Sequence, residues 1–227
     1  MNVVYGGWRS HLQRGVMTLV ALLGLIVSAA AVAGPVPEAT ARPAPARTVL
    51  VLGDSLSAAY GLASNQGWVA LTARRMAASH PGWKVVNASI SGETTAGDAG
   101  RAAGELKRHR PAVVVVELGA NDGLRGLPLA QTRANLERIV RASQEAGARV
   151  LLLGMRMPPN FGPAYTQGFE ANFKDLARTY RTGLLPFFLE PIAMRRTNFQ
   201  ADNLHPTAAA QPLLRDHVWP VLAPLLK

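Results

Sequence analysis

The 227-residue sequence contains no cysteine. This absence excludes disulfide bonds, thiolate metal ligands, a cysteine nucleophile and a lipid-modified cysteine. Glycine-rich phosphate motifs are missing as well, because neither Gly-x-Gly-x-x-Gly nor a Walker A sequence follows the first predicted strand. We therefore expect no nucleotide cofactor. The sequence also lacks Gly-x-Ser-x-Gly, which excludes the nucleophile elbow of ordinary α/β-hydrolases.

Acidic residues are scarce, with 14 Asp and Glu against 24 Lys and Arg and a formal net charge of +10. After residue 33 the balance is 22 bases to 14 acids, a net charge of +8. The bases are scattered over predicted helices, without a dense basic arm, a zinc-finger pattern or an aromatic RNA-binding pattern. Nucleic acid is therefore not an expected partner. The charge is compatible with transient contact with membrane lipid, and we expect a monomer.

The first 47 residues have the pattern of a delivery segment. Arg9 and Arg14 precede an uncharged, mostly apolar run over residues 16–33 that ends in Ala-Val-Ala. This pattern predicts a signal peptide over residues 1–33, cleaved near Ala33, and hence a periplasmic or secreted protein. An uncleaved signal anchor is the alternative, since eighteen apolar residues can just span a bilayer. The Ala/Pro-rich residues 34–47 are predicted to be a linker, which leaves one domain over residues 48–227.

Strand-like and helix-like segments alternate through this domain. The predicted strands are Val49–Leu52, Lys84–Ile90, Ala112–Leu118, Arg149–Met155 and Leu184–Leu189. The predicted helices are Gln66–Ser79, Thr95–His109, Pro128–Ala146, Pro163–Tyr180 and Thr207–Leu225. This alternation predicts an α/β fold with a five-stranded parallel sheet and helices on both faces, a flavodoxin-like three-layer sandwich.

Three chemically useful residues follow the first three predicted strands: Ser55, Gly92 and Asn121. Taken alone, Ser55 reads as a turn or helix-capping residue, as Gly92 and Asn121 do at strand ends. The carboxyl ends of parallel strands, however, meet at one edge of the sheet, where ligands bind. Together the three residues supply what acyl transfer requires, a serine nucleophile and donors for an oxyanion.

A serine nucleophile needs a base, and His205 is the best placed histidine of the predicted domain. It lies in a turn-like stretch, three residues after Asp202, so a tight turn can bring the carboxylate back to the imidazole. The alternative for Asp-x-x-His is a helix cap or half of a metal site. No matching second His/Asp cluster is present, and we expect no metal.

These residues stand in four motifs that resemble the sequence blocks of the SGNH, or GDSL, hydrolases, in the same order and with similar spacing. The motifs are Gly53-Asp54-Ser55-Leu56-Ser57, Ser91-Gly92-Glu93-Thr94, Gly119-Ala120-Asn121-Asp122-Gly123 and Asp202-Asn203-Leu204-His205-Pro206. The resemblance is greatest to exported bacterial acyl thioesterases, lysophospholipases and arylesterases. It implies Ser55 as nucleophile, His205 as base and Asp202 as its orienting acid. It also implies an oxyanion hole made by Ser55, Gly92 and Asn121.

The implied reaction is hydrolysis of small-molecule acyl esters or thioesters, including lysophospholipid and aryl esters, without a cofactor. Substrate preference is expected from the loops over the strand ends. The candidate substrate-binding residues are Leu124, Arg125, Leu127, Met157 and Phe161. Core-facing anchors of ordinary loops remain an equal interpretation of these side chains.

Two other functions stay open from the sequence. Members of the resembling family can be carbohydrate O-deacetylases, for which a more polar acyl site is expected. A catalytically silent envelope-binding module with the same fold is the alternative outside enzymes, and the complete set of Ser55, Asp202 and His205 argues against it.

Overall fold

The computed structural model describes residues 46–227. The predicted signal peptide, its cleavage site near Ala33 and almost all of the predicted linker lie outside the described residues. Within the described part the domain begins slightly earlier than expected. Arg47 already belongs to the first strand, where it pairs with Trp83 and donates its N–H to the carbonyl of Gly82.

Five parallel strands form one sheet, which confirms the predicted fold class. The strands are β1 (Arg47–Gly53), β2 (Trp83–Asn87), β3 (Val113–Glu117), β4 (Arg149–Leu153) and β5 (Gly183–Leu185), in the order β2-β1-β3-β4-β5. The chain therefore winds outward in both directions from β1 and β3. In such sheets the ligand site lies at the carboxyl ends of the strands, where the order reverses.

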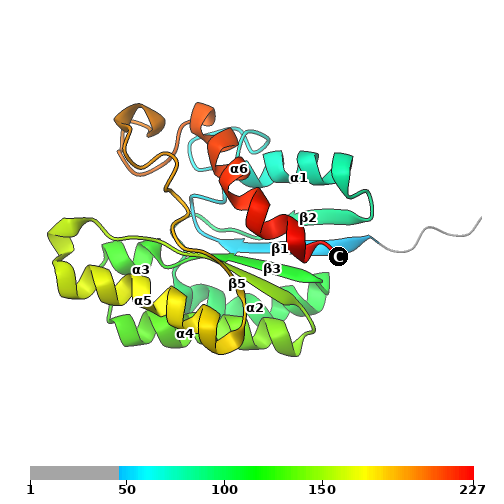
Figure 1. Ribbon diagram of the computed structural model, residues 1–227, viewed down its shortest axis with the longest axis horizontal. Coiled ribbons are helices and arrows are strands. Elements are labelled where there is room, and N and C mark those ends of the chain that lie inside the picture. Colours follow the sequence, from blue (N-terminus) through cyan, green and yellow to red (C-terminus); the bar gives the residue numbers. More distant parts are fainter. Residues whose placement is uncertain (1–45) are drawn as a thin grey trace, which may run out of the picture. The chain divides into compact units, whose positions relative to one another are not determined.

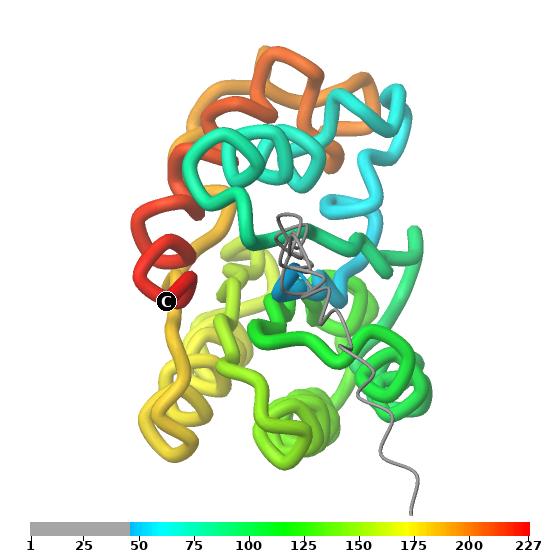
Figure 2. The backbone as a smooth tube through the Cα atoms, turned by 90° about the vertical axis from the view of Figure 1, so that its right-hand side faces the viewer, coloured from blue at the N-terminus to red at the C-terminus, as the bar shows by residue number. Residues whose placement is uncertain are grey.

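Helices cover both faces of the sheet, as Figures 1 and 2 show. One face carries α1 (Trp68–Ser79) and α6 (Gln211–Leu222), which pack against each other. The other carries α2 (Thr95–His109), α4 (Leu129–Glu145) and α5 (Pro163–Tyr180), with α4 in contact with both α2 and α5. No helix within residues 46–227 combines the length and the apolar character that crossing a bilayer would require.

The central strands are apolar because both of their faces are covered. Val113–Val116 of β3 are completely buried, and Leu50 and Leu52 of β1 are buried beside them. A continuous apolar run is what a strand with helices on both faces requires. Glu117 ends β3 and is also completely buried, an exception that becomes important at the site.

Several boundaries differ from those expected from the sequence. The second and fifth strands are shorter, ending at Asn87 and Leu185, and the last helix is bounded by 3₁₀ turns. The expected loop after β3 instead contains a short helix, α3 (Ala120–Leu124). Gly119 begins it with φ of 107°, a conformation that favours glycine. A Cβ atom at Gly119 would also lie 3.3 Å from the ring of Phe173.

Candidate active site

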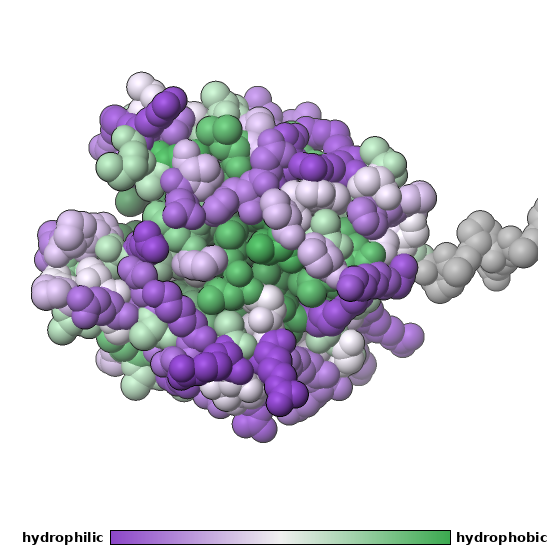
Figure 3. Space-filling model, viewed as in Figure 1, coloured by the Kyte–Doolittle hydropathy of each residue, from purple (hydrophilic) through white to green (hydrophobic). Residues whose placement is uncertain are grey.

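The carboxyl ends of the strands surround a cavity of about 440 Å³. Figure 3 shows a notch in the molecular outline on this side, to the left in the view of Figure 1. Four of the five predicted catalytic and oxyanion-hole residues line this one cavity: Ser55, Gly92, Asn121 and His205. They come from chain segments as far as 150 residues apart, so the fold, not the sequence neighbourhood, brings them together.

Ser55 lies in a tight turn directly after β1. The carboxylate of Asp54 accepts a hydrogen bond of 3.0 Å from the Leu56 N–H, an Asx-type turn that holds the chain at Ser55. The carbonyl of Asp54 also accepts from the N–H of Ala58 at 2.9 Å. Asp54 is completely buried, whereas the Ser55 side chain is partly exposed in the cavity. The turn therefore buries the aspartate and presents the serine.

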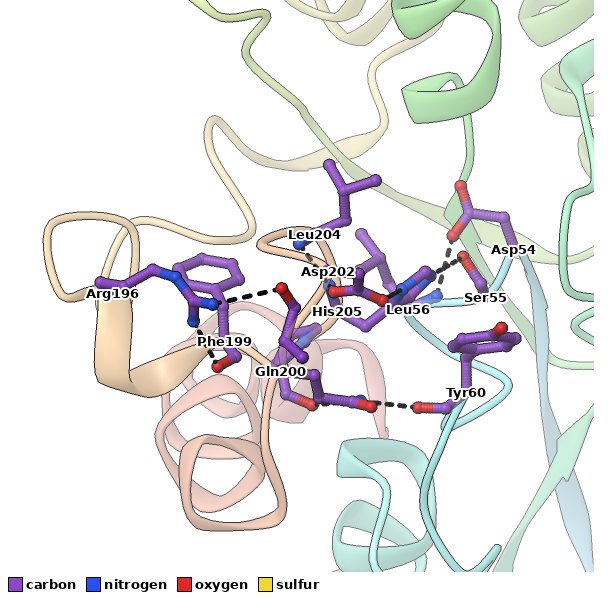
Figure 4. A network of polar contacts seen from close by, with 12 residues as sticks. Asp54, Ser55, Leu56, Tyr60, Arg196, Phe199, Gln200, Asp202, Leu204 and His205 are labelled. Atoms are coloured by element: carbon purple, nitrogen blue, oxygen red, sulfur yellow. Dashed lines mark hydrogen bonds and ion pairs between the residues drawn. The ribbon is translucent and has the colours of Figure 1, made fainter.

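His205 and Asp202 lie in the long connection between β5 and α6, and Figure 4 shows how this loop faces Ser55. One oxygen of Asp202 accepts hydrogen bonds from the N–H groups of Leu204 and His205, at 2.9 and 3.0 Å. Asn203, inside this turn, has φ of 61°, a left-handed conformation that asparagine tolerates well. The turn leaves the second oxygen of Asp202 free to face the imidazole.

Serine, histidine and aspartate form a continuous hydrogen-bonded chain. The Nε2 atom of His205 lies 2.9 Å from the Ser55 Oγ, and its Nδ1 lies 2.7 Å from Oδ2 of Asp202. If Nδ1 carries the proton and donates it to Asp202, Nε2 is free to accept the serine proton. The hydrogen bond to the imidazole, followed by those from the two backbone N–H groups, holds the pKa of Asp202 well below its ordinary value.

Gly92 and Asn121 border the same cavity from the ends of β2 and β3. Gly92 has φ of 82° and no side chain that would cover its N–H. The side-chain amide of Asn121 donates to the carbonyl of Glu93 at 2.9 Å and more weakly to Oδ2 of Asp54 at 3.3 Å. Both amide hydrogens therefore have partners in the free protein. An oxyanion in the cavity would have to compete with Oδ2 of Asp54 for one of the Asn121 amide hydrogens, since that hydrogen bond is the longer and weaker of the two.

The cavity wall contains only two of the five predicted substrate-binding residues, Leu124 and Met157. The other three, Leu127, Phe161 and Arg125, do not line this cavity, and their role in substrate binding stays a prediction. The Leu127 carbonyl accepts a hydrogen bond of 2.9 Å from the Tyr165 hydroxyl, and Phe161 stacks on the same tyrosine. The Arg125 guanidinium instead donates to the Gly92 carbonyl at 3.3 Å.

Two contributors to the site were missed by the sequence reasoning. The ring of Tyr60 stacks on the His205 imidazole with ring centroids 4.3 Å apart, and it lines the cavity. Gln200 donates from Nε2 to the carbonyls of Tyr60 and Pro206, at 2.8 and 3.1 Å, and so joins the two loops (Figure 4). Neither residue stands in a chemical motif, so only their positions near Ser55 and His205 in the sequence could have suggested them.

Metal-binding groups are not gathered in the part of the chain that the structure describes. Among residues 46–227 no three His, Asp or Glu side chains are grouped so that they could hold a metal ion. The carboxylate of Asp202 already binds the imidazole and the backbone of its own turn. The alternative of an Asp-x-x-His half-site for a metal therefore has no partner cluster here.

A doubly wound parallel sheet with a Ser–His–Asp chain at its carboxyl edge defines a serine hydrolase of the SGNH type. Residues 51–212 match the GDSL-like lipase/acylhydrolase family, and the chain belongs to that family.

Known relatives agree with this assignment. The chain is 49% identical to the esterase TesA of Pseudomonas aeruginosa, over 81% of this chain and 91% of that protein. It is 41% identical to the thioesterase 1/protease 1/lysophospholipase L1 of Escherichia coli K12, over 82% of this chain and 88% of that one. Among solved structures it resembles the psychrotrophic esterase EstA of Pseudoalteromonas inhibited by monoethylphosphonate, with a TM-score of 0.76, 41% identity and coverage of 79% and 98%.

Proposed function

We propose that the protein hydrolyses carboxylic esters and acyl thioesters through a covalent acyl intermediate on Ser55. The observation that carries this proposal is the hydrogen-bonded chain from Ser55 Oγ through the His205 imidazole to Asp202. In this proposal Ser55 is the nucleophile, His205 is the general base and Asp202 orients and stabilises the imidazolium.

In the first half of the reaction, the Ser55 Oγ attacks the acyl carbon while its proton moves to Nε2 of His205. The carbonyl oxygen becomes an oxyanion, for which the N–H groups of Ser55 and Gly92 and the amide of Asn121 are the donors. Nε2 then gives its proton to the leaving alcohol or thiol, and the acyl group stays on the serine.

In the second half, a water molecule attacks the acyl-serine. His205 takes a proton from this water and returns it to the Ser55 oxygen when the carboxylic acid leaves. No cofactor is needed for either half, because every proton that moves is carried by the imidazole.

The cavity favours an apolar acyl chain. Its wall includes Leu124, Met155, Met157 and Leu189, which offer no hydrogen-bond donors to a substrate. Arg156 lines the same cavity, is exposed and pairs with Glu170 at 3.3 Å. An anionic head group would bind there in competition with this carboxylate. Fatty-acyl, lysophospholipid and aryl esters fit this combination of an apolar wall and one cation.

We further propose transient contact with membrane lipid during substrate uptake. Three cavity residues are unusually exposed for their type: Tyr60 at 51%, Leu204 at 49% and Leu124 at 39%. Apolar side chains around the mouth of a cavity are typical of surfaces that meet lipid. Sedimentation with anionic and neutral vesicles tests this, and equal recovery in the supernatant with and without vesicles would refute it.

We also propose export to the periplasm or the medium, on the basis of the pattern of residues 1–33, and that the exported protein is a monomer. Cell fractionation and N-terminal sequencing of the released protein test this proposal. A mature N-terminus near Gly34 in the periplasmic fraction is expected, and an uncleaved chain in the membrane fraction would contradict it. Size-exclusion chromatography with light scattering measures the oligomeric state.

The activity itself is tested with p-nitrophenyl esters of increasing chain length, using wild type, Ser55→Ala and Ser64→Ala. Ser64 is exposed and does not line the cavity, so it is the matched control. Hydrolysis should be lost only in Ser55→Ala, with a preference for acyl chains longer than acetyl. Activity that survives in Ser55→Ala would refute the role of Ser55 as the nucleophile. Exclusive use of acetyl esters would favour a carbohydrate O-deacetylase.

A further inference from the structure

Two buried carboxyl groups beside the nucleophile have no role in the steps described so far. Asp54 and Glu117 are each completely shielded from solvent. They end neighbouring strands, where Gly53 of β1 is in register with Glu117 of β3. Their carboxyl groups are in hydrogen-bonding contact.

Two carboxylates in contact inside a protein repel each other unless one carries a proton. Only one oxygen of Glu117 has a protein donor, the Ser57 hydroxyl at 2.7 Å. The second oxygen has no donor within the described residues. That oxygen is where a proton can sit and be donated to Asp54, because its other surroundings provide no competing hydrogen bond.

Asp54 links the protonation of Glu117 to the active site. One of its oxygens accepts from the Leu56 N–H and the other from the Asn121 amide. The hydrogen-bonded chain therefore runs from Ser57 through Glu117 and Asp54 to Asn121. Its far end is the side chain that would stabilise the oxyanion.

The proton matters because of what Asn121 must do. A fully charged Asp54 would retain the amide hydrogen that the oxyanion needs, and two charged carboxylates would repel the oxyanion itself. One shared proton lowers the pull of Asp54 on this hydrogen and limits the pair to a single negative charge. The charged or titratable neighbours of Asp54 other than Glu117 are His205, Asp122 and Asp98.

Electrostatics agree with a shared proton. Burial raises the pKa of Asp54 to about 6. Burial, together with the negative charge of Asp54, raises the pKa of Glu117 well above its ordinary value. Two carboxyl groups this close titrate as a pair, so the proton belongs to both.

We propose that Glu117 is a positioning residue that stays protonated in the working enzyme and, through Asp54, sets the Asn121 amide for the oxyanion. This inference rests on the proposed function, since it assigns Asn121 to the oxyanion. It adds a residue outside the four motifs, which acts without touching the substrate.

Glutamine and methionine at position 117 separate the possible roles. Gln has the shape of the protonated acid, donates to Asp54 and accepts from Ser57, whereas Met has similar length without hydrogen bonds. Glu117→Gln should keep kcat within about threefold of wild type. Glu117→Met should lose about 30-fold in kcat with little change in KM, less than the 10²–10³ lost when an oxyanion donor itself is removed.

Infrared difference spectroscopy at neutral pH gives a readout that does not depend on turnover. A protonated carboxyl group has a carbonyl stretch that a carboxylate lacks, and the Glu117 part of this band should disappear in Glu117→Gln. The part from Asp98, whose pKa burial raises to about 7, should remain. The matched control is Glu137→Gln, a partly buried glutamate of α4 paired with Tyr180, in which the band and kcat should remain. This measurement decides the proposal even if Glu117→Met fails to fold.

Three outcomes would overturn the inference. An unchanged infrared band in Glu117→Gln shows that Glu117 carries no proton. Glu117→Gln as inactive as Glu117→Met shows that a charged carboxylate is needed. Wild-type kcat in a folded Glu117→Met shows that the site does not depend on Glu117. Each leaves the proposed function intact, because that stands or falls with Ser55→Ala.

Discussion

The nucleophile half of the site, with Ser55 and Asp54 after β1 and Asn121 after β3, is attached to buried strand ends. The base half, with Asp202 and His205, lies in the long loop between β5 and α6 and not directly at the end of a strand. Asp54 is completely buried, whereas the Asp202 side chain is 37% exposed. The first half is thus held by the core of the protein and the second by local hydrogen bonds.

This difference separates stability from activity. A change at the nucleophile half disturbs buried hydrogen bonds between strands, so it should lower both the stability and the rate. A change at the base half disturbs a partly exposed turn, so it should lower the rate with a smaller loss of stability. Loops that carry function on a rigid scaffold commonly show this behaviour.

The largest effect is expected from the base half. His205→Ala removes the proton acceptor of Ser55, and kcat should fall on the order of 10⁶-fold, as for the loss of a triad histidine in other serine enzymes. The midpoint of thermal unfolding should stay close to that of wild type. The control is His109→Ala, a helix-end histidine paired with Glu105. A large loss of stability in His205→Ala would contradict the separation.

Asp202→Asn should lower kcat by about 10⁴-fold, because an amide can no longer fix the imidazole tautomer. The loss should be mainly in kcat, since Asp202 does not line the cavity. Kinetics on a short and a long p-nitrophenyl ester measure it. An increase in KM with unchanged kcat would mean that Asp202 acts in substrate binding instead.

Asp54→Asn should lower kcat by about 10²-fold and also reduce the free energy of unfolding, because a buried amide cannot reproduce both carboxylate acceptors. The raised pKa of Asp54, about 6, means that the stability it contributes is present below the unfolded pKa and is lost as pH rises through about 6. The advantage of wild type over Asp54→Asn should shrink by roughly 2 kcal/mol between pH 4 and pH 7. Denaturant unfolding at both pH values measures this.

Asp202 should show the opposite pH dependence, because its folded-state pKa is lowered. The stability that it contributes is present above the unfolded pKa and is lost as pH falls toward the folded value. Wild type and Asp202→Asn should therefore converge in stability at acid pH. If the stability difference from wild type changes with pH in the same direction for Asp54→Asn and Asp202→Asn, the contrast between the two halves is wrong.

The smallest effect is expected at the connection between the halves. Gln200→Ala removes the hydrogen bonds to the carbonyls of Tyr60 and Pro206, and kcat should fall about fivefold, since a net hydrogen bond contributes roughly 1 kcal/mol. Gln131→Ala, at an exposed position of α4, is the control and should retain full activity. Equal activity of Gln200→Ala and wild type would show that the base loop holds its position without this glutamine.

The same contrast explains what could be predicted from the sequence. The apolar run of β3 and the turn residues after it have local signals, so the sheet and the placement of Ser55 and Asn121 at its edge were predictable. Asp202 and His205 were predictable because they are close together in the chain and form a turn by themselves. The distance of 2.9 Å between the Ser55 Oγ and Nε2 of His205 depends on the fold and could not be derived from the sequence.

The failures are equally informative. Leu127 and Phe161 were expected to bind substrate because they are apolar loop residues, but neither lines the cavity. Phe161 stacks on Tyr165, whose hydroxyl donates to the Leu127 carbonyl. The helix α3 was read as a loop, because Asn, Asp and Gly are weak helix formers. Glu117 was taken as part of an apolar strand. A carboxylate inside such a run is rarely buried without a partner, and this signal could have drawn attention to it.

The most direct test of the account is covalent labelling with a fluorophosphonate, followed by peptide mass mapping. We predict one adduct per wild-type chain, on Ser55, and labelling that is lost in Ser55→Ala and strongly slowed in His205→Ala although both variants remain folded. An adduct on any other residue, or equally rapid labelling of wild type and His205→Ala, would contradict a serine nucleophile activated by the imidazole of the loop.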